Sequence, residues 1–167
     1  MIVPKSSSFF KDIQAKELTF GELNVPSKKA YIWFFAIVQG CDMINAIMDI
    51  LPGDALNPSD ISESAWELMF ERISAHLKGA TFRYLDVPVA EIQSLILNHN
   101  QSIKEDYAIW SDYAKSYGTH GVEHYPETDR FPCISFSGDQ DIIWDGWHRL
   151  HSYINNNHST IPVLECQ

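Results

Sequence analysis

Five consecutive residues near the end of the chain carry the side chains best suited to chemistry: Asp145, Gly146, Trp147, His148 and Arg149. A short apolar run before them indicates a strand, and the spacing after them indicates a helix. The glycine therefore falls at a strand-to-helix junction, where the first N–H groups of the helix point outward and attract anions. This turn is a candidate binding site for a phosphate group.

The two basic side chains of the turn suit such a ligand. Arg149 could hold a phosphate through two parallel hydrogen bonds, and His148 could donate another or transfer a proton. Asp145 could orient either side chain or hold a metal ion that accompanies the phosphates. A purely structural interpretation is equally open, in which Asp145 is the N-cap of the helix and Arg149 pairs with a nearby carboxylate.

Short elements on both sides must position this turn. Two strands joined by a hairpin turn at residues 137–140 are predicted before it, and one strand is predicted after its helix. The predicted order is strand, turn, strand, glycine, helix, strand, over Cys133–Phe136, Ile142–Trp144, the helix from Trp147 to about Asn155, and Thr160–Leu164.

Residues 142–150 (IIWDGWHRL), with Ile161-Pro162-Val163 after the helix, resemble the signature of the ParB/sulfiredoxin superfamily, in which a turn of this kind cradles nucleotide phosphates. Residues 85–92 (LDVPVAEI) resemble the first strand of the same domain, so the resemblance covers about residues 81–166. It implies an α+β fold with a small mixed sheet. It also implies a nucleoside triphosphate, ATP or CTP, bound with Mg²⁺ at Asp145–Arg149.

Departures from the family pattern narrow the implied function. Trp147 stands where sulfiredoxins, by this resemblance, place a catalytic cysteine, and the turn is not the Glu-Arg-Arg form of chromosome-partitioning proteins. We therefore expect neither thiol chemistry nor centromere binding. The resemblance then implies nucleotide hydrolysis or phosphoryl transfer, as in an ATPase or a small-molecule kinase. A metal-dependent nuclease is a third possibility.

A rival hypothesis is an acidic protein-binding inhibitor, carried by a plasmid or phage, that keeps the fold without turnover. The net charge of −10 supports it, because such a surface suits a basic partner and opposes nonspecific attraction to nucleic acid. Ordinary solubility explains the same charge. The partner surface would be the acidic face or the N-terminal helices.

Three further side chains are candidates only through the resemblance. Asn98 and His99 are predicted in a polar loop after a short helix at 90–97, and the corresponding region of the family faces the nucleotide. An ordinary helix-terminating loop is the alternative. Glu105 closes a predicted capping box at 102–105, which would start a helix that runs to Tyr117 and has Tyr117 on its inner face. As a carboxylate, Glu105 is also a candidate general base for phosphoryl transfer.

The first part of the chain, residues 1–79, is predicted to be a helical elaboration packed on a domain at 80–167. One long buried helix is expected from Pro26 to Leu51, with an apolar face made of Phe34, Ile37, Val38, Cys41, Ile44, Met48 and Leu51. A second helix is expected to begin with a capping box at Asp60 and Glu63 and to carry one apolar stripe, made of Trp66, Met69, Phe70, Ile73 and Leu77. The pair is expected to be antiparallel. A partner-binding surface is the alternative use of these helices.

Composition sets the remaining bounds. An apolar content of 45% in 167 residues is enough for a packed core and excludes a disordered chain. Three scattered cysteines indicate a reducing compartment, and we expect a cytoplasmic protein because the N-terminus lacks a signal peptide. The apolar run at 30–38 is too short to span a bilayer. Histidines and acids at 120–129 are expected to form a polar loop rather than a metal site.

Overall fold

The computed structural model describes residues 8–55, 57–117, 133–135 and 142–166. They form two compact units. One contains residues 17–82, and the other combines residues 8–16 with 83–166. The division into domains predicted between residues 79 and 80 stays a prediction. Residues 8–16 group with the second unit and not with the helices that follow them in the chain.

The first unit begins with a 3₁₀-helix at Phe20–Glu22 and the helix α1 at Val25–Tyr31. Asn24 caps α1 by accepting a hydrogen bond from the Ser27 N–H at 2.9 Å. The chain continues as a π-helix, Ile32–Val38, and resumes as a 3₁₀-helix at Asp42–Ala46. The predicted single helix from Pro26 to Leu51 is therefore wrong, because Gly40 takes the left-handed φ of 62° and ends the helical hydrogen bonding.

The π-helix also changes which side chains are buried. Its i→i+5 bonding closes with the Gln39 N–H donating to the Phe34 carbonyl at 2.8 Å. The buried residues are Ile32, Phe35 and Ala36, whereas the predicted face included the exposed Val38. An i→i+5 turn holds more residues than an α-turn, so a face counted at α-helical spacing drifts out of register.

The first unit also contains the helix α2, Glu63–His76. Ser62 is its N-cap and accepts a hydrogen bond from the Ala65 N–H at 3.2 Å. Asp60 instead ends a 3₁₀-helix at Pro58–Asp60, where its carboxylate accepts from the Asn57 N–H at 2.8 Å. The predicted cap at Asp60 is thus wrong. The predicted apolar stripe is confirmed at four buried positions: Trp66, Met69, Phe70 and Ile73.

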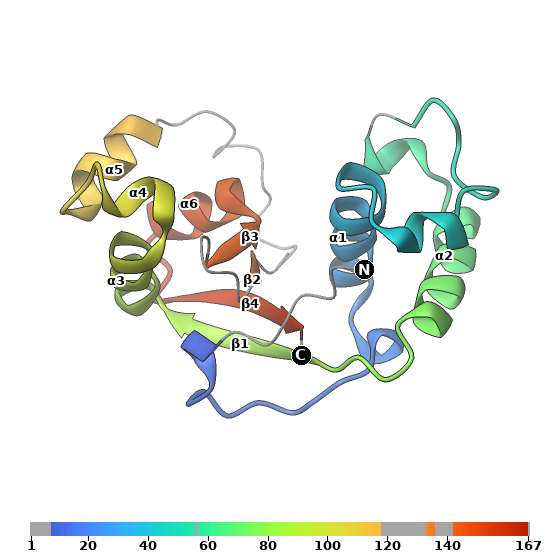
Figure 1. The fold of residues 1–167 in the computed structure, drawn as a ribbon, viewed down its shortest axis with the longest axis horizontal. Coiled ribbons are helices and arrows are strands. Elements are labelled where there is room, and N and C mark those ends of the chain that lie inside the picture. The colour runs from blue at the N-terminus through green and yellow to red at the C-terminus, as the bar shows by residue number, and fades with distance from the viewer. Residues whose placement is uncertain (1–7, 56, 118–132, 136–141, 167) are drawn as a thin grey trace. The chain divides into compact units, whose positions relative to one another are not determined.

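The second unit is built on a four-stranded sheet (Figure 1) of order β1-β4-β2-β3. Its strands are Phe82–Pro88 (β1), Cys133–Ser135 (β2), Ile143–Asp145 (β3) and Thr160–Cys166 (β4). Strand β2 pairs parallel with β4 and antiparallel with β3, so the sheet is mixed and the predicted α+β class is confirmed at that level. The predicted hairpin turn at 137–140 and the polar loop at 120–129 lie outside the described residues.

Within the described residues, four α-helices accompany this sheet: Val89–His99 (α3), Gln101–Lys104 (α4), Trp110–Tyr117 (α5) and Trp147–Asn155 (α6). The single helix predicted at 102–117 is wrong, because the structure has two separate helices there, α4 and α5. Asn100 caps α4 by accepting from the Ser102 N–H at 3.2 Å, so the helix begins earlier than predicted. The N–H groups of Asp106 and Tyr107 then both donate to the Ile103 carbonyl, which closes a tight turn and ends α4.

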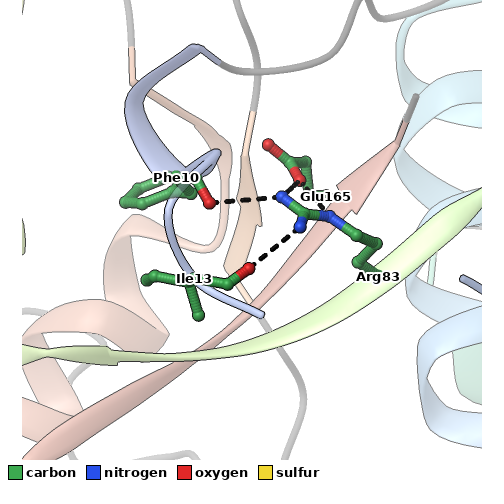
Figure 2. Close-up of polar contacts among 4 residues, drawn as sticks. All are labelled: Phe10, Ile13, Arg83 and Glu165. Carbon is green, nitrogen blue, oxygen red and sulfur yellow. Dashed lines mark hydrogen bonds and ion pairs between the residues drawn. The ribbon is translucent and has the colours of Figure 1, made fainter. Parts of the chain in front are cut away.

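A buried ion pair ties the N-terminal segment to the sheet (Figure 2). Arg83 on β1 donates from Nε to Glu165 Oε2 at 2.8 Å, and both side chains are buried. The same guanidinium donates to the backbone carbonyls of Ile13 at 2.9 Å and Phe10 at 3.2 Å. The Phe10 side chain is fully buried in the core of this unit. Residues 8–13 are thus part of the second unit's structure.

Across the ranges that the structure covers, no helix combines the length and the apolar character needed to cross a bilayer.

Candidate functional site

The turn sits between a strand and a helix, as the sequence predicts. Strand β3 ends at Asp145, Gly146 is the N-cap in the left-handed region (φ 96°, ψ 24°), and α6 begins at Trp147. The Leu150 N–H donates to the Gly146 carbonyl at 2.8 Å and starts the helix. The structural interpretation that made Asp145 the N-cap is wrong, because the cap position falls one residue later.

Glycine is required at position 146 by space as well as by conformation. A Cβ there would lie 2.9 Å from Arg149 Nη2, 3.0 Å from Arg149 Nε and 3.1 Å from the Cys133 Cα. The Arg149 side chain therefore folds back over the backbone of the turn instead of extending along α6. This arrangement places a guanidinium beside the first turn of a nine-residue helix.

Arg149 also has a partner within the turn. Its Nη2 donates to Asp145 Oδ2 at 3.0 Å, and the two side chains are 12% and 29% exposed. The pairing proposed in the structural interpretation is thus present, with Asp145 itself as the carboxylate. An anion that binds here has to share the guanidinium with Asp145 or displace it.

His148 is exposed and is held from a neighbouring helix. Its Nδ1 lies 3.0 Å from the hydroxyl of Tyr117, the last residue of α5. The Tyr117 ring in turn stacks on His151 of α6, with centroids 3.7 Å apart and planes 8° from parallel. Sequence reasoning placed Tyr117 on an inner helix face but missed this link, although the tyrosines and the histidines each recur at helical spacing.

Behind this contact lies a buried histidine. His151 is 3% exposed, its Nε2 is 3.1 Å from the Tyr113 hydroxyl, and Trp110 stacks near it with centroids 5.6 Å apart. Burial, with a smaller effect of the neighbouring His148, lowers the pKa of His151 to about 4. Burial likewise raises the pKa of Tyr113. His151 is therefore neutral at physiological pH, and sequence reasoning did not single it out.

The floor of the turn is apolar. Cys133 is fully buried at the start of β2, and its Sγ donates to the Gly146 carbonyl at 3.4 Å. Burial raises the pKa of the Cys133 thiol to about 12, so the thiolate is strongly disfavoured there. Trp147 is half-buried and packs against the core. In this geometry Trp147 supports the turn from the apolar side.

The other predicted site residues contact residues outside the turn. Asn98 and His99 are the last two residues of α3, so the predicted loop at this point is wrong. Asn98 donates to the Ser94 carbonyl at 2.8 Å, and the His99 ring lies 5.0 Å from that of Phe9. Glu105 is exposed and accepts from the Gln101 side chain at 3.1 Å.

The turn offers one carboxylate to a metal ion, and that carboxylate already pairs with Arg149. Among the described residues, no group of three or more histidine, cysteine, aspartate or glutamate side chains is placed to hold a metal. Mg²⁺ in nucleotide sites is commonly bound by one or two carboxylates together with the phosphates. Any Mg²⁺ at Asp145 would therefore depend on phosphate oxygens for most of its ligands.

Comparisons of this chain with protein-family models, with curated proteins and with solved structures find no match. The resemblance of the turn to the ParB/sulfiredoxin signature accordingly stays a prediction.

Proposed function

We propose that the turn from Asp145 to Arg149 binds the phosphate groups of a nucleotide, and that hydrolysis or phosphoryl transfer follows. One observation carries the proposal: the Arg149 guanidinium lies over Gly146 at the N-terminus of α6, where a Cβ would collide with it. A positive charge and outward-pointing backbone N–H groups thus meet at one place, which is the arrangement that binds anions.

Four residues of the turn have distinct roles in this proposal. Arg149 supplies the charge that stabilises the phosphates, and Gly146 lets them approach the backbone. His148 supplies a hydrogen bond to a phosphoryl oxygen. Asp145 holds Arg149 in place and is the carboxylate available to a Mg²⁺ ion that the nucleotide brings with it.

Calorimetry with ATP, CTP, GTP and their diphosphates, with and without Mg²⁺, tests this proposal. Losing the Arg149 contact in Arg149→Ala should cost about 1.5–3 kcal/mol, which is about a tenfold to hundredfold loss of affinity. Arg72→Ala is the matched control. It removes the same charge from a surface ion pair with Asp49 and should leave binding unchanged.

Asp145→Asn separates two roles of the carboxylate. Without Mg²⁺, binding should tighten, because the phosphates no longer compete with Asp145 for the guanidinium. If Asp145 also holds the ion, the gain in affinity that Mg²⁺ confers on the wild type should disappear in this variant. The exposed Asp54→Asn makes the same charge change away from the turn and serves as its control.

The rival is an acidic binding protein that keeps this turn as a structural element. It is favoured by the internal partners of both basic side chains, since Arg149 pairs with Asp145 and His148 with Tyr117. The net charge of −10 fits a basic protein partner. Absence of binding by wild-type protein to every nucleotide at millimolar concentration would reject the phosphate site and leave this rival.

A further inference from the structure

Two tyrosine–histidine pairs join α5 to α6. On α5, Tyr113 and Tyr117 are one helical turn apart, and on α6 His148 and His151 are also about one turn apart. The outer pair joins the Tyr117 hydroxyl to His148 Nδ1 at 3.0 Å, and the inner pair joins the Tyr113 hydroxyl to His151 Nε2 at 3.1 Å. The outer histidine belongs to the proposed phosphate turn.

We propose that Tyr117 is a positioning residue that fixes His148 in the tautomer with its proton on Nε2, so that His148 meets the phosphate as a hydrogen-bond donor and not as a base. This inference rests on the proposed function for its ligand. The tautomer itself is a property of the free protein.

The tautomer follows from the chemistry of the contact. A phenol hydroxyl is a good donor and a poor acceptor, because its oxygen lone pair is delocalised into the ring, whereas an unprotonated imidazole nitrogen is a good acceptor. Tyr117 therefore donates to His148 Nδ1. A neutral imidazole carries one proton, so that proton is on Nε2.

The position of the Tyr117 hydroxyl is set by the packing behind it. The Tyr117 ring lies flat on His151, and the His151 ring is itself packed between Tyr117 and the Trp110 ring. His151 is 3% exposed, so this support is part of the core rather than of the surface. Because the Tyr117 ring is fixed by this packing, its hydroxyl determines the orientation of the exposed His148 ring.

The tautomer decides what His148 can do. An Nε2–H group donates to a phosphoryl oxygen, whereas a general base needs a bare nitrogen at the reacting atom. If Nδ1 is occupied by the Tyr117 hydroxyl and Nε2 carries the proton, the neutral ring has no free acceptor. His148 then adds to the binding of charge at the turn and leaves proton abstraction to another group.

Nitrogen NMR of protein with ¹⁵N-labelled histidine, at a pH where the rings are neutral and without nucleotide, reports the tautomer directly. Wild-type His148 should show a protonated Nε2 and a hydrogen-bonded, unprotonated Nδ1. In Tyr117→Phe, which keeps the stacked ring and removes only the hydroxyl, the Nδ1 resonance of His148 should move toward that of a free acceptor. The affinity of the Tyr117→Phe variant for the nucleotide should fall about twofold to tenfold.

Tyr113→Phe is the matched control, because it removes the hydroxyl of the inner pair. It should move the Nε2 resonance of His151 and leave the nitrogen resonances of His148 and the affinity unchanged. A proton on Nδ1 of wild-type His148, or a Tyr117→Phe spectrum in which His148 does not move, overturns the proposal. So do equal losses of affinity in both variants, which would indicate a general loosening of the two helices.

The two proposals fail separately. The expected spectra with no nucleotide binding would reject the phosphate site and keep the positioning role of Tyr117. Nucleotide binding that depends on Arg149, with His148 protonated on Nδ1, would keep the phosphate site and reject the positioning role.

Discussion

At the scale of single residues, Gly146 and Arg149 require one another. The left-handed backbone at Gly146 turns the chain from β3 into α6, and the missing Cβ leaves room for the Arg149 guanidinium. The guanidinium then reaches Asp145 across one helical turn. The turn is therefore specified by backbone conformation, space and charge together, and a change in any of them should be measurable.

Substitution of Gly146 by alanine, compared with a control glycine, separates the cost of a left-handed backbone from the cost of a steric clash. Gly146→Ala should lower the free energy of unfolding by about 2–5 kcal/mol, because a left-handed alanine and an overpacked contact both cost energy. Gly79→Ala is the control, since Gly79 has the same φ of 96° with nothing within 4 Å of the added Cβ. It should cost only about 1–2 kcal/mol in urea unfolding. Equal losses in the two variants would mean that space at the turn is unimportant.

His151 should make stability depend on pH. Its pKa is about 4 in the folded protein and near 6.5 when unfolded, so the unfolded chain binds the proton first. The contribution of neutral His151 to the free energy of unfolding is complete above about pH 6.5 and is lost as the pH falls to about 4. The free energy of unfolding should fall by up to about 3 kcal/mol over this range. Urea unfolding at a series of pH values measures this. His151→Phe, which keeps a ring between Tyr117 and Trp110, should flatten the slope; an unchanged slope contradicts the assignment.

At the scale of elements, β1 and β4 hold the N-terminal segment through one buried guanidinium. Arg83 and Glu165 are 82 positions apart, and Arg83 also binds two backbone carbonyls of residues 10–13. Glu165 Oε1 is buried without a hydrogen-bond partner among the described atoms. The carboxylate thus depends on Arg83 for its neutralisation, which makes the pair sensitive to the loss of one member.

Removing one charge should therefore cost more than removing both. Arg83→Met leaves the Glu165 carboxylate buried and unpaired, and should lower the unfolding free energy by about 3–5 kcal/mol. The double variant Arg83→Met with Glu165→Leu should recover a large part of this loss in the same urea titration. If the double variant is no more stable than Arg83→Met alone, the buried charge is not the source of the loss.

At the scale of the whole molecule, the boundary between the two units does not follow chain order. Residues 8–16 belong with the sheet of the second unit, although the helical unit begins only at residue 17. Phe10 is fully buried in the second unit's core, and Phe35 is fully buried in the first. Two phenylalanines in the N-terminal part of the chain thus stabilise different units.

Hydrogen exchange should separate these contributions. Phe10→Ala and Phe35→Ala should each cost about 3–5 kcal/mol, because each leaves a large cavity. Faster amide exchange should appear in β4 and α6 for Phe10→Ala, and in α2 for Phe35→Ala. Each variant is the control for the other. Faster exchange throughout the chain in both variants would show that the two units unfold together.

Local patterns in the sequence predicted the elements whose signals are themselves local. The strand, glycine and helix around Gly146 and the apolar stripe of α2 are confirmed, and the last strand, predicted at 160–164, is confirmed and runs on to residue 166. The failures arose where one spacing fits two outcomes. Apolar residues at 26–51 recur at α-helical spacing throughout, yet the π-helix and Gly40 interrupt the α-helix there. Both Asn100 and Ser102 are suitable N-cap residues for α4, and the structure uses Asn100.

What the sequence by itself determined is the α+β class and the turn that brings Asp145, His148 and Arg149 within one helical turn. Only the tertiary structure decided the partners of those side chains. Tyr117 is 31 positions from His148, Tyr113 is 38 positions from His151, and Arg83 is 82 positions from Glu165. Periodicity and turn chemistry act over a few residues, whereas these contacts exist only after separate helices and strands have packed. The burial that makes His151 neutral and leaves Glu165 dependent on Arg83 arises at the same step.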